Sequence, residues 1–140
     1  MKRRDVSEVV LVELPRHTRD DGELVVIEAG ESIPYPAVRT FTVRATEGAV
    51  RGRHAHKQCN QFLVCVHGAI DVECDDGANK ATFRLDAGHQ GLLVPASIWA
   101  TETYVVSGSI LTVLCDRTYE AGDYLRDYEE FLRWRTSTDE

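Results

Sequence analysis

The stretch QFLVCVHGAIDVECDDG, residues 61–77, contains two predicted strands joined by a glycine turn. In the second strand Ile70, Val72 and Cys74 alternate with acidic residues, which is typical of a strand with one buried and one solvated face. The first strand, 61–66, is apolar on both faces, as expected for the middle of a sheet. The stretch therefore predicts a β-sheet with a buried central strand.

Similar segments recur along most of the chain, separated by turns that contain glycine. The predicted strands are 9–14, 23–29, 38–45, 61–66, 69–74, 80–85, 90–95 and 109–115. Their spacing predicts an all-β sandwich or small barrel. The segment 119–134 instead has apolar residues at helical spacing, so it predicts a short amphipathic C-terminal helix. We expect one domain over 1–135 and a frayed tail over 136–140.

Composition excludes several classes of protein. The chain has 140 residues and a formal net charge of −7, which argues against a nucleic-acid-binding surface but leaves room for a local phosphate pocket. No run of 18 apolar residues exists, so no membrane span is predicted. Acidic residues interrupt any signal-like N-terminal stretch, and the four cysteines show no CxxC pairing. We therefore predict a cytoplasmic protein with reduced thiols.

The pair His54 and His56 carries the main functional signal. Residues at alternate positions of a strand point to the same face. The pair is the polar face of an ordinary strand, a metal site, or two proton carriers. Gln61 brings no charge to offset a dication, and two neutral imidazoles without a carboxylate or a third histidine hold a divalent ion poorly. We therefore predict no metal, and two histidines that accept or donate protons near neutral pH.

The spacing from His54 to Gly68, HxH-x4-Q-x6-G, matches the first motif of cupin metal sites, with Gln61 in place of glutamate. In the second motif the third-histidine position falls on Ala100. The chain thus resembles a cupin, which implies a jelly-roll β-sandwich.

More specifically, the chain resembles the WxcM-like cupins that are sugar 3,4-ketoisomerases acting on dTDP-4-keto-6-deoxyglucose. The distinctive motifs are RG-x-HAH and the closing D-x-x-Y-x-x-x-DY-x-R-x-Y-x-x-F. The stretches that carry the resemblance are 20–28, 51–56, 61–77, 92–100 and 114–131. Two departures stand out: Phe41 replaces a common tyrosine, and the chain reads Trp99-Ala100-Thr101 where W-H-E is common.

The resemblance implies an isomerase of deoxysugar biosynthesis that uses no metal and no cofactor. A base removes the proton at C3 of a dTDP-linked 4-keto sugar, an enediol forms, and protonation at C4 leaves the 3-keto isomer. It assigns His54 and His56 to catalysis, with His54 as the carbon base and His56 moving protons at the oxygens, although the order of these roles stays open. Such a base should have a pKa near 7.

The resemblance also implies the binding residues and the assembly. Arg39 and Arg51 line the pocket and hold the diphosphate or sugar oxygens. Gln61 orients a histidine or a sugar hydroxyl, and Phe41 lies in the pocket strand. Trp99 either packs in the core or stacks on the thymine or sugar ring. A homodimer is expected, with N-terminal strands exchanged or sheets joined across the interface.

Two other functions stay open at this point. One is a metal-dependent cupin enzyme such as a dioxygenase. The other is a non-catalytic sugar-nucleotide-binding cupin, which the departures at Phe41 and Ala100 keep in consideration.

Overall fold

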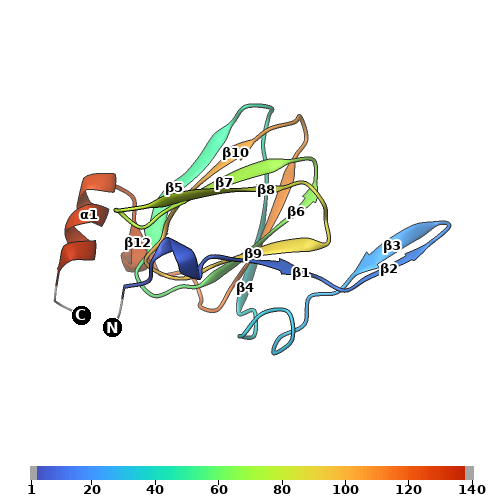
Figure 1. The fold of residues 1–140 in the computed structure, drawn as a ribbon, viewed down its shortest axis with the longest axis horizontal. Coiled ribbons are helices and arrows are strands. Elements are labelled where there is room, and N and C mark those ends of the chain that lie inside the picture. The colour runs from blue at the N-terminus through green and yellow to red at the C-terminus, as the bar shows by residue number, and fades with distance from the viewer. Residues whose placement is uncertain (1–2, 138–140) are drawn as a thin grey trace.

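Two five-stranded antiparallel sheets face each other in the computed structural model, which describes residues 3–137 (Figure 1). The first sheet has the order β1-β9-β6-β11-β4, with bounds β1 Val10–Glu13, β9 Gln90–Val94, β6 Gln61–His67, β11 Ile110–Cys115 and β4 Arg39–Arg44. The second has the order β12-β5-β10-β7-β8, with bounds β12 Tyr124–Leu125, β5 Val50–His56, β10 Trp99–Tyr104, β7 Ile70–Asp75 and β8 Lys80–Leu85.

From β4 to β11 the chain crosses between the two sheets at every connection except the hairpin of β7 and β8, in jelly-roll order. One sheet contains β4, β11, β6 and β9 side by side, and the other contains β5, β10, β7 and β8. This arrangement, with one C-terminal helix, confirms the predicted all-β sandwich. The strand β6 lies in the middle of its sheet, as its two apolar faces predicted.

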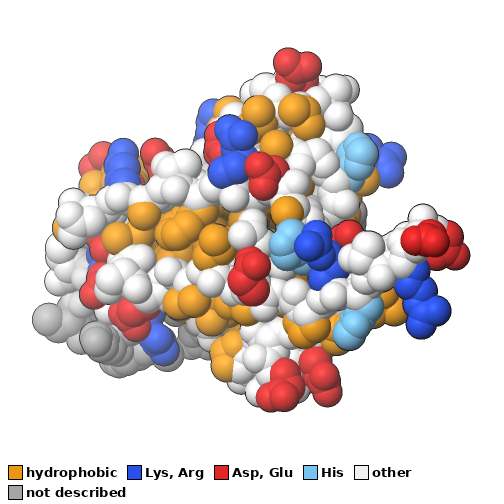
Figure 2. All heavy atoms as spheres, turned by 45° about the vertical axis from the view of Figure 1, so that its right-hand side comes forward, with side chains coloured by type: hydrophobic (Ala, Val, Ile, Leu, Met, Phe, Trp, Pro, Cys, Tyr) orange, Lys and Arg blue, Asp and Glu red, His pale blue; other side chains and the backbone are white. Residues whose placement is uncertain are grey.

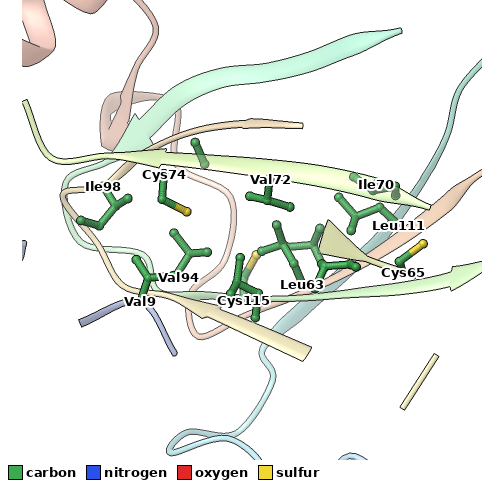
Figure 3. Packing of buried hydrophobic residues seen from close by; sticks show 14 of the residues in the cluster. Val9, Leu63, Cys65, Ile70, Val72, Cys74, Val94, Ile98, Leu111 and Cys115 are labelled. Atoms are coloured by element: carbon green, nitrogen blue, oxygen red, sulfur yellow. The ribbon is translucent and has the colours of Figure 1, made fainter. Parts of the chain in front are cut away.

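The main core lies between the sheets (Figure 3). The alternating residues Ile70, Val72 and Cys74 of β7 are fully buried and face Leu63 and Leu111 of the opposite sheet. Burial of such side chains stabilises the fold by about 1.5–3 kcal/mol each. A smaller apolar cluster of Ala55, Trp99, Leu125 and Phe131 joins β5, β10 and β12 to the C-terminal helix.

The C-terminal helix is shorter than the segment 119–134 predicted. Helix α1 spans Tyr128–Thr136, and it is preceded by the 3-10 turn η2 (Ala121–Asp123) and the short strand β12. Asp127 caps the helix by accepting a hydrogen bond from the backbone of Glu130. The helical spacing of the apolar residues misled the prediction because Leu125 belongs to β12 and is buried against β5. Of the predicted tail, residues 138–140 lie outside the described part of the chain.

A hairpin near the N-terminus projects from the sandwich, at the end opposite α1 (Figure 1). It consists of β2 (Arg16–Arg19) and β3 (Gly22–Val25), which pair only with each other. The predicted strand 23–29 therefore ends at Val25, and β2 and β10 are strands that periodicity did not single out. No helix within residues 3–137 has the length and apolar character needed to cross a membrane.

Candidate functional site

A β-bulge in β5 sets which side chains enter the sandwich. His54 lies opposite Ala100 of β10, whereas Gly52 lies opposite Thr101, so Arg53 is the extra residue. Gly52 and Arg53 have φ angles of 81° and 59°, in the left-handed region that favours glycine. The bulge interrupts the two-residue alternation of the strand.

As a result, three side chains of β5 share the inner face. Arg51 and His54, three positions apart, would point to opposite sides of a regular strand. The bulge brings both to the wall of the same cavity, and His56 follows two positions after His54 on the same face. The RG-x-HAH motif is therefore a bulged strand that directs two imidazoles inward and places the exposed Arg51 at the cavity wall.

The cavity between the sheets has a volume of about 200 Å³. Four residues predicted to form the site line it: Phe41, Arg51, His54 and Gln61. Four polar residues that the predictions did not place there also line it: Glu102, Tyr104, Tyr124 and Arg126. Nonpolar walls come from residues of β4, β6 and β11, and the polar groups converge against them, as is typical of small-molecule sites.

The two imidazoles and one phenol form a tight aromatic group. The ring centroids of His54 and His56 are 5.1 Å apart with the planes nearly perpendicular. The ring of Tyr124 lies 4.3 Å from that of His56 and 5.2 Å from that of His54. The guanidinium of Arg126 lies 4.2 Å from the centre of the Tyr124 ring. A cation and a phenol thus stand beside both candidate proton carriers.

His56 is anchored by a carboxylate. Its Nδ1 atom lies 2.9 Å from Oδ2 of Asp123, and both side chains are at most 9% exposed. Because a carboxylate only accepts, Nδ1 carries the proton and Nε2 presents a lone pair. The Nε2 atom is buried and has no hydrogen-bond partner among the described residues. It is therefore an unpaired proton acceptor next to His54, the imidazole that lines the cavity.

Asp123 is fixed by the loop that follows β5. Its carboxylate accepts hydrogen bonds from the backbone of Gln58 at 2.7 Å and of Cys59 at 3.3 Å. Its own carbonyl accepts from the backbone of Lys57 at 2.8 Å. The pairing of Tyr124 with His56 in β12 and β5 continues this contact. Within the segment that periodicity assigned to a helix, Tyr124–Leu125 are instead a short strand that pairs with β5.

Both histidines are neutral at neutral pH. Burial lowers the pKa of His54 to about 4, with a smaller contribution from neighbouring His56. Burial also lowers the pKa of His56, while the hydrogen bond and charge of Asp123 act in the opposite direction. The pKa of His54 therefore lies below the value near 7 expected for the base. The reason is desolvation, which penalises the charged imidazolium.

Arg39 lies behind Tyr124. Its Nη2 atom donates to the Tyr124 hydroxyl at 3.4 Å and to Sγ of Cys115 at 3.6 Å. Gln61 donates from Nε2 to the same sulfur at 3.6 Å. Arg39 thus orients a cavity residue, and the structure does not place it on the cavity wall formed by Arg51.

Trp99 lies away from the cavity. Its ring packs against Tyr128 and Phe131 of the helix region, with centroids at 5.2 Å and 5.5 Å, and it is only 8% exposed. Of the two interpretations of Trp99, the structure thus favours core packing.

Sequence reasoning missed the roles of Asp123, Tyr124 and Arg126, although a signal was present. All three belong to the DY-x-R part of the closing motif. Glu102 had no such signal, because nothing in its neighbours indicates that β10 exists.

A group of potential metal ligands lies beside the site, since ligand atoms of His56, Cys59 and Asp123 are within 4.8 Å of one another. Hydrogen bonds from His56 and from the loop backbone already occupy the Asp123 carboxylate.

Comparison with known proteins gives a consistent result. Residues 7–136 match the sequence profile of the FdtA family, described as WxcM-like, C-terminal. The TDP-4-oxo-6-deoxy-alpha-D-glucose-3,4-oxoisomerase of Aneurinibacillus thermoaerophilus is 35% identical over 114 residues, which are 81% of this chain and 82% of that protein.

Solved structures show the same fold. A 3,4-ketoisomerase from Helicobacter canadensis superimposes with a TM-score of 0.89 and 27% identity, covering 93% of this chain and 98% of that one. A TDP-quinovose 3,4-ketoisomerase from Campylobacter jejuni gives a TM-score of 0.85 and 29% identity, covering 91% and 99%.

Proposed function

The chain belongs to the FdtA family of WxcM-like proteins, and from this membership we propose that it is a sugar-nucleotide 3,4-ketoisomerase. The substrate is a TDP-linked 4-keto-6-deoxyhexose, and the product is its 3-keto isomer. The observation that carries the proposal is the pair of neutral imidazoles beside the cavity, one of which has a buried and unpaired Nε2. The family membership confirms the resemblance drawn from RG-x-HAH and the closing motif.

His54 is the carbon base. It lines the cavity and is neutral, so it accepts the C3 proton, which the neighbouring C4 ketone acidifies. Its low pKa is the result of burial among uncharged and cationic groups. The negative diphosphate of a bound substrate favours the imidazolium and raises the pKa towards the range that proton transfer needs.

His56 acts on a substrate oxygen. Asp123 holds the ring by Nδ1 and stabilises the imidazolium that forms when Nε2 accepts a proton, as in other carboxylate–histidine pairs. The proton that Nε2 accepts is that of the C3 hydroxyl, and His54 then returns its own proton to C4. Once the C4 oxygen has also taken up a proton, these transfers convert the 4-keto sugar to its 3-keto isomer.

The remaining residues bind and orient the substrate. Arg51 and Arg126 line the cavity and are suited to the diphosphate or the sugar oxygens, because guanidinium groups bind such anions through paired hydrogen bonds. Arg39 contributes by holding the Tyr124 hydroxyl. Gln61 hydrogen bonds to a sugar hydroxyl, and Phe41 packs against the sugar ring.

The assembly is a homodimer in which the projecting β2–β3 hairpin packs on a second copy. The hairpin carries Leu24, which is 57% exposed, and the edge strand β1 exposes Val10 and Leu11. Figure 2 shows apolar side chains exposed on the face that comes forward in this view. Unpaired apolar edges favour such pairing. The four buried free thiols fit a reducing compartment, the cytoplasm.

The decisive experiment is proton NMR of TDP-4-keto-6-deoxyglucose mixed with the protein in deuterium oxide. We expect deuterium to enter at C3 and then at C4 as the 3-keto isomer appears. Stabilisation by TDP without any exchange would identify a non-catalytic binder and overturn the proposal.

A further inference from the structure

Glu102 is a carboxyl group in the wall of the cavity whose role the steps above do not explain. It lies on β10 opposite Arg51 of β5, two positions after Ala100, which faces His54. Residues two apart on a strand share a face, so Glu102 and Ala100 lie on the same side of β10. Glu102 is therefore the next residue on the cavity wall after the one that lies opposite His54.

Gly52 brings Glu102 and His54 together. The backbone of Gly52 lies beside the His54 ring and acts to raise the pKa of that imidazole. Both carboxylate oxygens of Glu102 lie beside the same residue, only 2.8 Å from where a Cβ atom at position 52 would stand. A side chain at position 52 would displace the carboxylate. The glycine of RG-x-HAH thus leaves space for an acid next to the base.

The carboxyl group of Glu102 lacks a partner. No hydrogen bond or ion pair to it exists among residues 3–137, and beside this half-buried residue the hydroxyl of Tyr104 is buried and unpaired. Native proteins rarely leave such groups unsatisfied unless a ligand or water completes them. Burial raises the pKa of Glu102 to about 7, with Arg51 acting weakly in the opposite direction. Burial therefore favours the protonated, neutral form of this carboxyl group.

We propose that Glu102 is the general acid that gives a proton to the C4 carbonyl oxygen of the sugar. The inference rests on the proposed ketoisomerase function and supplies the donor that the two histidines leave undefined. The elements packed around Glu102 contribute no second carboxyl group to the described cavity wall. The titratable and charged groups that face it are Arg51, His54, Cys74, Tyr104, Tyr124 and Arg126.

The protons balance over one turnover. In the first half, His54 takes the C3 proton while Glu102 gives its proton to the C4 oxygen, which yields the neutral enediol. In the second half, His56 takes the proton of the C3 hydroxyl while His54 gives its proton to C4, which yields the 3-keto sugar. His56 then carries one extra proton and Glu102 lacks one, and exchange through water resets both before the next turnover.

The test compares Glu102→Gln with the wild-type protein on TDP-4-keto-6-deoxyglucose. Glutamine keeps the size and the hydrogen-bonding amide but has no acidic proton. We expect kcat/KM to fall by about 100-fold or more, the usual range for loss of a general acid, while the affinity for TDP stays within about threefold. The matched control is Glu73→Gln on the outer face of β7, which should change neither quantity.

The pH profile separates proton donation from a structural role. The wild-type kcat/KM should fall above pH about 7 as Glu102 loses its proton, and this limb should disappear in Glu102→Gln. Glu102→Asp keeps a carboxyl group, so its kcat/KM should be lower than that of the wild type but should still fall at high pH. This variant replaces Glu102→Gln in the test if the glutamine variant folds poorly. A glutamine variant as fast as wild type, or an unchanged limb, overturns the inference alone. A wild-type protein that forms no 3-keto sugar overturns the proposed function instead.

Discussion

The Oδ2 atom of Asp123 lies 2.9 Å from Nδ1 of His56, although the two residues are 67 positions apart in the chain. The contact ties the C-terminal segment to the centre of the β5 motif and fixes the tautomer of the imidazole. The same residue stabilises the fold, because Asp123 also accepts hydrogen bonds from the backbone of Lys57 and Gln58 in the loop after β5.

Replacing Asp123 by asparagine should therefore impair catalysis more than folding. An amide can donate to Nδ1, which would move the proton to Nε2 and remove the lone pair that accepts from the substrate. We expect kcat to fall by about 100-fold to 10,000-fold, as for other carboxylates that orient a catalytic histidine. Rates of isomerisation and affinity for TDP check this. Glu120→Gln, at an exposed position three residues earlier, is the control and should remain at wild-type rate.

Replacing His54 by asparagine should abolish exchange at C3 and leave TDP binding nearly unchanged. The imidazole lies opposite Ala100 and lines the cavity, and in the proposed mechanism it accepts the carbon proton while the arginines hold the nucleotide. Incubation with TDP-4-keto-6-deoxyglucose in deuterium oxide measures this directly. His67→Asn, at the exposed end of β6, controls for the loss of a histidine elsewhere. Wild-type isomerisation by the His54 variant would show that another group is the base.

Much of the scaffold follows from local patterns, and much of the site does not. The alternation of Ile70, Val72 and Cys74 predicts a strand with one buried face, and the apolar run of β6 predicts a strand buried on both faces. Both strands can be predicted because burial acts on the residue type at each position of the sequence. Asp123 reaches His56 only through tertiary contacts, and its neighbours gave a helical spacing that concealed β12. The bulge at Gly52 likewise depends on pairing with β10, which periodicity did not reveal.

Removal of divalent metals should leave isomerisation unchanged. All proposed steps move protons between side chains and substrate. The cavity wall combines one imidazole, one amide and one carboxyl group with two tyrosines and two arginines, and the charges of the arginines repel a dication. The measurement is activity after dialysis against EDTA, with metal content determined on protein without a histidine tag. A stoichiometric metal whose loss abolishes activity would instead support a metal-dependent cupin enzyme.

The proposed dimer predicts a mass near twice 15.7 kDa in solution. Leu11→Arg on β1 should weaken it, because a charge would be placed on an apolar edge that a second copy covers. Val106→Arg, on the turn between β10 and β11, is the matched control, since both side chains belong to residues that are 42% exposed. Light scattering across a dilution series checks both variants. A wild-type protein that stays monomeric throughout would contradict the proposed assembly.

Acidification should act on stability through two opposing groups in the cavity. The pKa of His54 is about 4 in the native state and about 6.5 when unfolded, so between these values the unfolded chain binds more protons and stability falls as the pH falls. The pKa of Glu102 is raised from 4.5 to about 7, so in almost the same window the native state binds more protons and stability rises. His56, whose pKa is also lowered, adds to the loss.

The wild-type free energy of unfolding should therefore change little between pH 7 and pH 5. Glu102→Gln should expose the histidine effect and lose about 2 kcal/mol over this range, since a tenfold change in proton affinity corresponds to about 1.4 kcal/mol. The free energy of unfolding of His54→Asn should instead rise or stay unchanged as the pH falls from 7 to 5. The lowered pKa values of Asp71 and Asp76 act below this window and do not disturb the comparison. Urea unfolding of the three proteins at both pH values measures the effect, and parallel responses of the two variants would show that the groups do not titrate as the cavity indicates.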